Sequence, residues 1–85
     1  MRLDLFLATL GIIKRRTEAK EKSENGLVSV NGRVVKPAYE VRIGDIIAIG
    51  GADPRALEVL KLPHGSVRKD LRGEYTRALP VAGSR

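Results

Sequence analysis

The sequence predicts a small α+β domain in which two short helices are followed by a small antiparallel β-sheet. Two patterns lead to this prediction: apolar residues recur at helical spacing near the N-terminus, and beyond Gly26 they alternate as in strands. Length is the third observation, because 85 residues accommodate one small domain. A chain this short buries only a modest part of its surface, so a thin core is expected.

Two helices are expected in the first 25 residues. The apolar stripe of the first has the spacing i, i+3, i+4 and i+7 and consists of Leu3, Phe6, Leu7 and Leu10. Gly11 is its expected end. The second helix is predicted for about residues 16–25, with Ala19 facing the core and Gly26 as a left-handed cap. Because this helix is poor in apolar residues, the aliphatic stems of its lysines are expected to help it pack.

Short strands are expected after Gly26. The Asn31-Gly32 dipeptide is a strong signal for a two-residue hairpin turn, and Gly44-Asp45 is a second expected turn. The predicted strands are residues 27–30, 33–35, 46–49 and 57–62.

Residues 1–62 are predicted to form the folded domain, and residues 63–85 a basic, partly flexible tail. Glycine, proline and serine interrupt any pattern in the tail. One short helix is expected near residues 67–75, and fraying is expected beyond Pro80.

The charge pattern indicates a polyanionic partner. The net charge is +6; residues 1–22 carry six Lys or Arg against three acids, and residues 51–85 carry seven against four. No apolar run approaches the roughly 20 residues that span a bilayer. Asp4 interrupts the N-terminal apolar stretch, which argues against a secretory signal. A cytoplasmic protein without a membrane partner is therefore expected.

Several kinds of catalytic and metal site are disfavoured. The absence of cysteine excludes disulfides, thiolate catalysis and cysteine-type zinc sites. His64 stands alone, without partners at metal-ligand spacing, and is expected to be an exposed loop residue. Neither a metal nor a cofactor is predicted, and the protein is not expected to be an enzyme.

Three adjacent cations precede the second helix. Lys14, Arg15 and Arg16 lie where free backbone N–H groups and the helix dipole favour a phosphate. Arginine adds a planar fork of donors that matches phosphate oxygens. Lys20 lies one turn beyond Arg16, on a face that can carry both. The plainer alternative is a solvated basic connector, with Lys20 paired to neighbouring glutamates.

The order and spacing of several short motifs resemble one RNA-binding family. The motifs are Arg2-Leu3-Asp4, Lys14-Arg15-Arg16-Thr17, Gly26-Leu27-Val28-Ser29-Val30-Asn31-Gly32, Val34-Val35-Lys36-Pro37 and Gly44-Asp45-Ile46-Ile47. Together they resemble the domain named after small-subunit ribosomal protein S4, also called the alpha-L motif. Among its members the chain is most similar to the small stand-alone bacterial ones, the ribosome-associated quality-control and heat-shock S4 proteins.

The resemblance implies docking on large ribosomal subunits that still carry a peptidyl-tRNA, in quality control of stalled nascent chains. The implied partners are large-subunit rRNA and tRNA, with a nascent-chain tailing factor as a further candidate, and a monomer is expected. The candidate RNA-binding residues are Arg2, Lys14, Arg15, Arg16, Thr17, Lys20, Asn31, Arg33 and Lys36.

Some residues depart from the family or have plainer roles. Arg15 stands where a helix-capping serine is usual, and Lys22 where an apolar residue is usual. Asp4 is expected to hold a donor of the basic cluster in place. Arg2-Leu3-Asp4 also resembles a pseudouridine-synthase motif, but that motif needs a large catalytic domain. Asn31 is expected to form a turn first and an RNA contact second.

The low aromatic content points to recognition by shape and phosphate. Tyr39 and Tyr75 are expected to pack on the core, since 4% aromatic residues provide no stacking platform. Alternative functions remain open: a general rRNA-binding ribosomal or assembly protein, or an accessory RNA-binding domain acting with an RNA-modifying enzyme or synthetase. A DNA-binding helix-turn-helix is disfavoured because strands follow Gly26 directly.

Overall fold

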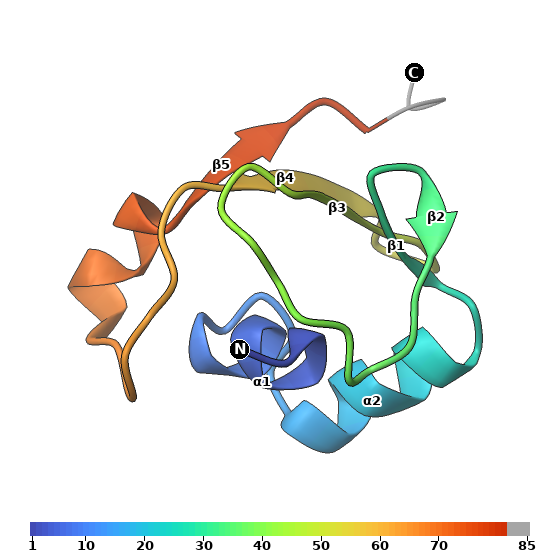
Figure 1. The fold of residues 1–85 in the computed structure, drawn as a ribbon, viewed down its shortest axis with the longest axis horizontal. Coiled ribbons are helices and arrows are strands. Elements are labelled where there is room, and N and C mark those ends of the chain that lie inside the picture. The colour runs from blue at the N-terminus through green and yellow to red at the C-terminus, as the bar shows by residue number, and fades with distance from the viewer. Residues whose placement is uncertain (82–85) are drawn as a thin grey trace.

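Two helices cover one face of a five-stranded antiparallel sheet with the strand order β2-β1-β3-β4-β5 (Figure 1). The computed structural model describes residues 1–81. Its elements are α1 (Leu3–Thr9), α2 (Arg16–Glu24), β1 (Val28–Val30), β2 (Arg33–Val34), β3 (Ile46–Ile49), β4 (Arg55–Val59), the 3-10 helix η1 (Lys69–Glu74) and β5 (Thr76–Leu79). The predicted α+β class is confirmed.

Both helices form and end where the sequence predicts. The stripe of α1 is buried, with Leu3, Phe6 and Leu7 fully so. Gly11 follows α1 with a φ of +68°, and Gly26 follows α2 with a φ of +76°. Glycine adopts this left-handed conformation without steric cost, so each helix ends there.

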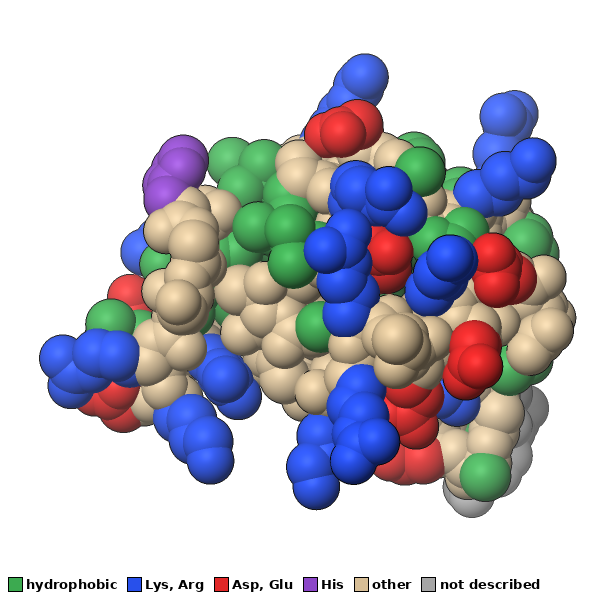
Figure 2. Space-filling view, turned by 90° about the horizontal axis from the view of Figure 1, so that it is seen from below, with side chains coloured by type: hydrophobic (Ala, Val, Ile, Leu, Met, Phe, Trp, Pro, Cys, Tyr) green, Lys and Arg blue, Asp and Glu red, His purple; other side chains and the backbone are tan. Residues whose placement is uncertain are grey.

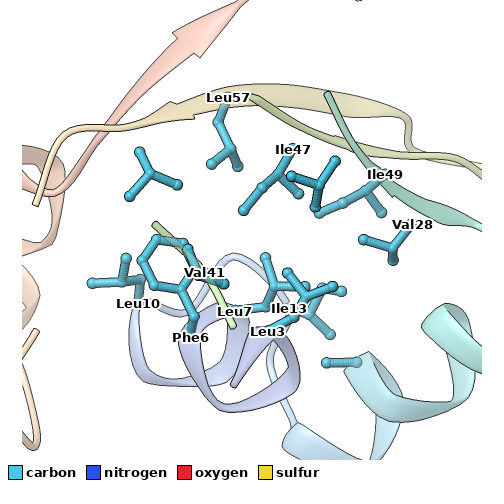
Figure 3. Close-up of a cluster of buried hydrophobic side chains, with 13 residues drawn as sticks. Leu3, Phe6, Leu7, Leu10, Ile13, Val28, Val41, Ile47, Ile49 and Leu57 are labelled. Atoms are coloured by element: carbon cyan, nitrogen blue, oxygen red, sulfur yellow. The ribbon is translucent and has the colours of Figure 1, made fainter. Parts of the chain in front are cut away.

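The core lies between α1 and the inner face of the sheet (Figure 3). Alternate strand residues point inward because side chains of a strand have a period of two. In one inward row Val30 pairs with Ile47, and Ile47 pairs with Leu57. These side chains meet Phe6 and its neighbours on α1, and each fully buried large apolar side chain contributes about 1.5–3 kcal/mol.

The hairpin between β1 and β2 has the predicted two-residue turn. Asn31 and Gly32 have φ values of +52° and +85°, as a type I′ turn requires. Val30 pairs with Arg33 across the turn.

The segment between β2 and β3 crosses from the sheet to the start of α1 (Figure 1). The Leu3 N–H donates to the Tyr39 carbonyl at 2.8 Å, and the Asp4 N–H donates to the Pro37 carbonyl at 3.2 Å. An isolated bridge joins Arg2 and Glu40. The first backbone N–H groups of a helix have no acceptor within the helix. Two such groups of α1 donate to carbonyl groups of this segment instead.

The last two strands differ from the prediction. β4 covers Arg55–Val59, two residues earlier than expected at its start and three earlier at its end. Beyond the predicted domain boundary at residue 62, η1 packs on β5, and β5 pairs with β4 from Val59↔Thr76 to Ala56↔Leu79. The prediction of a tail is wrong for residues 76–79, which complete the sheet. The expected short helix is present as η1. The predicted fraying beyond Pro80 falls largely on residues 82–85, outside the described part of the chain.

Candidate nucleic-acid interface

A buried carboxylate joins the starts of both helices. Asp4 on α1 is 1% exposed. Its Oδ1 accepts a hydrogen bond from Arg2 Nε at 3.2 Å, and its Oδ2 accepts one from Arg2 Nη2, also at 3.2 Å. Arg16 Nε, at the start of α2, lies 3.5 Å from the same Oδ2. The sequence-based expectation that Asp4 positions the basic cluster is confirmed.

The Asp4 carboxylate is held in its charged form. Burial alone raises its pKa, but hydrogen bonds from Arg2 and the Leu5 N–H, with the charges of Arg16 and Arg2, outweigh burial. The pKa of Asp4 therefore lies below its ordinary value of 3.8. Asp4 is therefore a negatively charged partner of Arg2 and Arg16 at neutral pH. The side chains of these two arginines remain 44% and 49% exposed.

The other predicted cations of the helical region are exposed. Lys14 lies in the connector, Arg15 is the N-cap of α2, and Lys20 lies one turn beyond Arg16. Within residues 1–81, none of these three cations has an ion-pair partner within 4.0 Å. As expected, Arg15 makes no side-chain capping hydrogen bond. Thr17 is exposed on the first turn of the same helix.

The remaining predicted residues come from the sheet side. Lys36 precedes Pro37, whose carbonyl contacts Asp4, so the chain brings Lys36 to the start of α1. Arg33 is exposed on the edge strand β2, in a different layer from the helices. The structure thus brings together Arg2 and Arg16 through Asp4.

Asn31 uses both ends of its side chain inside the protein. Its Nδ2 donates to Asp45 Oδ1 at 3.0 Å, and its Oδ1 accepts from the Ile46 N–H at 3.0 Å. Its structural role in the turn is therefore direct, and an RNA contact by Asn31 stays a prediction.

Asp45 is a second buried anion, and the sequence did not indicate its role. Its Oδ2 accepts from the Tyr39 hydroxyl at 2.8 Å and from the Arg42 N–H at 2.9 Å. Burial alone raises the pKa of Asp45. The hydrogen bonds from Arg42, Tyr39 and Asn31 and the charge of Arg42 lower this pKa by more, so it lies below its ordinary value. The hydrogen bond to Asp45 raises the pKa of Tyr39, with burial and the Asp45 charge adding to it. Tyr39 is thus tied into the fold through its hydroxyl group, and its ring packs against the core.

Cations of the C-terminal part are mostly paired with acids. Lys61 pairs with Glu74, Arg68 with Asp70, and Arg77 with Glu58. Lys14, Arg15 and Lys20, which have no such partner within residues 1–81, lie instead around the two helices. Figure 2 shows this side of the molecule, where many Lys and Arg side chains lie at the surface with acidic side chains among them. The helical side is therefore the more favourable surface for a polyanion.

Arg55 is a cation near this surface that sequence reasoning missed. Its Nη1 donates to the Ile12 carbonyl in the connector at 2.8 Å, 43 residues away in the chain. The residues next to Arg55 in the sequence do not indicate a contact with a residue so far away in the chain.

Within the described residues 1–81, no group of three or more His, Cys, Asp or Glu side chains is arranged to hold a metal ion. Over the same residues, no helix has the length and apolar character needed to cross a membrane.

Comparison with known proteins yields both a family and individual similar proteins. Residues 1–47 match the model of a family described as the S4 domain. The RQC P-site tRNA stabilizing factor of Streptococcus pneumoniae is 36% identical over 76 residues, which are 88% of this chain and 86% of that protein. The protein of the same name from Listeria innocua is 49% identical over 49 residues, about half of each chain at 58% and 53%.

A structure described as the trimeric Heat Shock Protein 15 of Vibrio cholerae has the same fold. It superposes with a TM-score of 0.85 and 28% sequence identity, covering 93% of this chain and 81% of that one.

Proposed function

The chain belongs to the S4 domain family, and from that premise we propose that it binds structured RNA and acts in ribosome-associated quality control by stabilising tRNA. A similar protein over most of its length is named for stabilising P-site tRNA in that process. The observation that carries the proposal is the anchoring of Arg2 and Arg16 on Asp4 beside the unpaired cations of the connector.

The proposed target is a large ribosomal subunit that retains a peptidyl-tRNA. The protein would contact rRNA and tRNA together, and a nascent-chain tailing factor would act on the same particle. Binding two RNA surfaces at a fixed separation raises affinity through effective concentration, without strong contacts to either one. The protein is proposed to work in the cytoplasm, as a monomer and without enzymatic activity.

The contacts are proposed to be mainly electrostatic. The proposed set is Arg2, Lys14, Arg15, Arg16, Thr17, Lys20, Asn31, Arg33 and Lys36. Anchored guanidinium groups lose little freedom on meeting a phosphate, so ordering by Asp4 lowers the cost of binding. With Tyr39 tied to Asp45, selectivity would come from RNA shape and phosphate positions.

Co-sedimentation tests the proposal. Tagged protein is mixed with purified large subunits that retain peptidyl-tRNA, with empty large subunits, with small subunits and with free tRNA. We expect strong co-sedimentation with the obstructed large subunits alone. Arg2→Ala and Arg16→Ala should each remove that preference, whereas Arg77→Ala, which changes a cation paired with Glu58, should keep it.

Equal binding to empty and obstructed subunits would indicate that the protein binds rRNA in general. A preference for small subunits would contradict the proposal.

A further inference from the structure

A cavity of about 310 Å³ opens between the connector of the two helices, α2 and the start of β4. Ile12 and Ile13 line it from the connector, and Ile49 lines it from β3. Ile13 and Ile49 belong to the buried core. The cavity therefore has an apolar floor continuous with the core, although its mouth faces solvent.

One wall of the cavity is a guanidinium group held at two points. Arg55 Nη1 donates to the Ile12 carbonyl at 2.8 Å, and Arg55 Nη2 donates to Asp53 Oδ2 at 3.2 Å. Two donors on different nitrogens fix the plane of the group. The side chain is still 49% exposed, so a flat cationic face remains available. Such a face stacks well on a nucleobase.

The rim carries further cations. Lys14 lines the cavity from the connector, and Lys22 lines it from α2. Lys22 Nζ lies 3.6 Å from the position that a β-carbon on Gly51 would occupy, so its ammonium group reaches the loop before β4. With Arg55, three cations face two acids, Glu18 and Asp53, and Asp53 is already engaged by Arg55. The cavity thus favours an anionic ligand with an apolar, planar part.

The cavity adjoins the proposed RNA-binding surface. Lys14 belongs both to the basic cluster before α2 and to the cavity rim. An RNA strand whose phosphate contacts Lys14 therefore passes the mouth of the cavity.

We propose that this cavity takes one unstacked nucleotide of the bound RNA. The base lies against the Arg55 guanidinium and the isoleucine floor, and the adjoining phosphate meets Lys14. The inference rests on the proposed RNA-binding function and adds a site for a single extruded base, in which only Lys14 is also assigned to phosphate binding.

A pair of RNA hairpins tests this site. They have the same paired stem and one bulged position, which is an adenosine in the first hairpin and an abasic nucleotide in the second. The backbone and charge are the same, so only the base differs. We expect the protein to bind the adenosine hairpin at least about fivefold more tightly, the lower end of the range for stacking of one base.

Two matched variants locate the effect. Arg55→Lys keeps the charge but removes the planar group, and it should reduce the preference for the adenosine hairpin, with unchanged affinity for the abasic one. Arg77→Lys makes the same change at an ion-paired residue of the neighbouring strand β5, and it should keep the wild-type preference.

The outcomes separate the two proposals. Equal binding of both hairpins by the wild-type protein overturns the nucleotide site and needs no variant, so misfolding of Arg55→Lys cannot obscure the result. An undiminished preference in folded Arg55→Lys overturns it as well. Arg16→Ala should weaken both hairpins by the same factor. If it weakens neither, the proposed phosphate surface fails, whatever the base preference.

Discussion

The carboxylate of Asp4 holds the guanidinium group of Arg2 at two points, with Nε and Nη2 each 3.2 Å from a different oxygen. The same carboxylate is 3.5 Å from Arg16 Nε. Two cations 14 residues apart in the sequence therefore share one buried anion. Because Arg2 precedes α1 and Arg16 begins α2, the packing of the two helices sets the distance between these two proposed RNA contacts.

Removing the charge of this anchor is expected to destabilise the fold. Asp4→Asn should lower the free energy of unfolding by about 1–3 kcal/mol, because buried hydrogen bonds from charged donors are lost. Asp70→Asn, which removes an exposed partner of Arg68, should have little effect, since exposed pairs contribute little. Urea unfolding followed by circular dichroism measures both, and equal midpoints for the two variants would argue against the anchor.

The anchored and the C-terminal arginines should differ in RNA binding. Arg16→Ala is expected to lose about tenfold or more in affinity, because one charge-assisted hydrogen bond contributes about 1.5–3 kcal/mol. Arg68→Ala and Arg77→Ala should lose less, since both residues lie in the C-terminal part of the chain, outside the proposed set of RNA contacts. Fluorescence anisotropy with a labelled tRNA measures the three, and circular dichroism checks that each remains folded. Equal losses would place the RNA contacts on a wider surface.

Binding should weaken steeply as salt concentration rises. Each phosphate contacted lowers the slope of log K against log salt by about 0.7–0.9, so four to six engaged cations give roughly −3 to −5. Arg16→Ala should make the slope shallower by about 1. A titration series in potassium chloride measures it, and a slope near zero with retained affinity would exclude phosphate-dominated binding.

Acid should destabilise the protein through two buried carboxylates. The pKa values of Asp4 and Asp45 in the fold lie below their ordinary value of 3.8. A group whose pKa is lower in the folded state contributes stability above its unfolded pKa and loses that contribution as pH falls through the folded pKa. We therefore expect the urea midpoint to be steady near neutral pH and to fall below about pH 4.

Asp45→Asn provides the comparison for this pH dependence. The variant should be less stable at neutral pH, and its midpoint should change less between about pH 5 and about pH 2, because one titrating carboxylate is gone. An unchanged slope in that interval would mean that Asp45 does not contribute to acid sensitivity.

The fifth strand should be needed for full stability. A chain of residues 1–62 lacks β5, which pairs with β4 along four residues, so β4 becomes an unpaired edge and loses its neighbour. We expect a lower thermal midpoint than for residues 1–81, which retain every described contact and serve as the control. Equal midpoints would support the domain boundary at residue 62 that the sequence predicts.

Local patterns in the sequence determined the first half of the fold. The spacing of Leu3, Phe6, Leu7 and Leu10 predicts α1, and Asn31-Gly32 predicts the β1–β2 hairpin, because helix periodicity and turn type depend on residues close together in the chain. The two glycines that end the helices were predictable for the same reason. The resemblance carried by motifs in residues 1–47 also pointed to the S4 domain family.

Other features depended on the tertiary structure. β5 contains only two apolar residues, Ala78 and Leu79, so no local pattern marks it, and it forms because β4 offers an unpaired edge. The roles of Asp45 and Arg55 were equally hidden: Asp45 accepts from Asn31, 14 residues away, and Arg55 donates to Ile12, 43 residues away. Hydrogen bonds of this kind leave no periodic trace in a sequence, because their geometry exists only after the sheet and helices have packed.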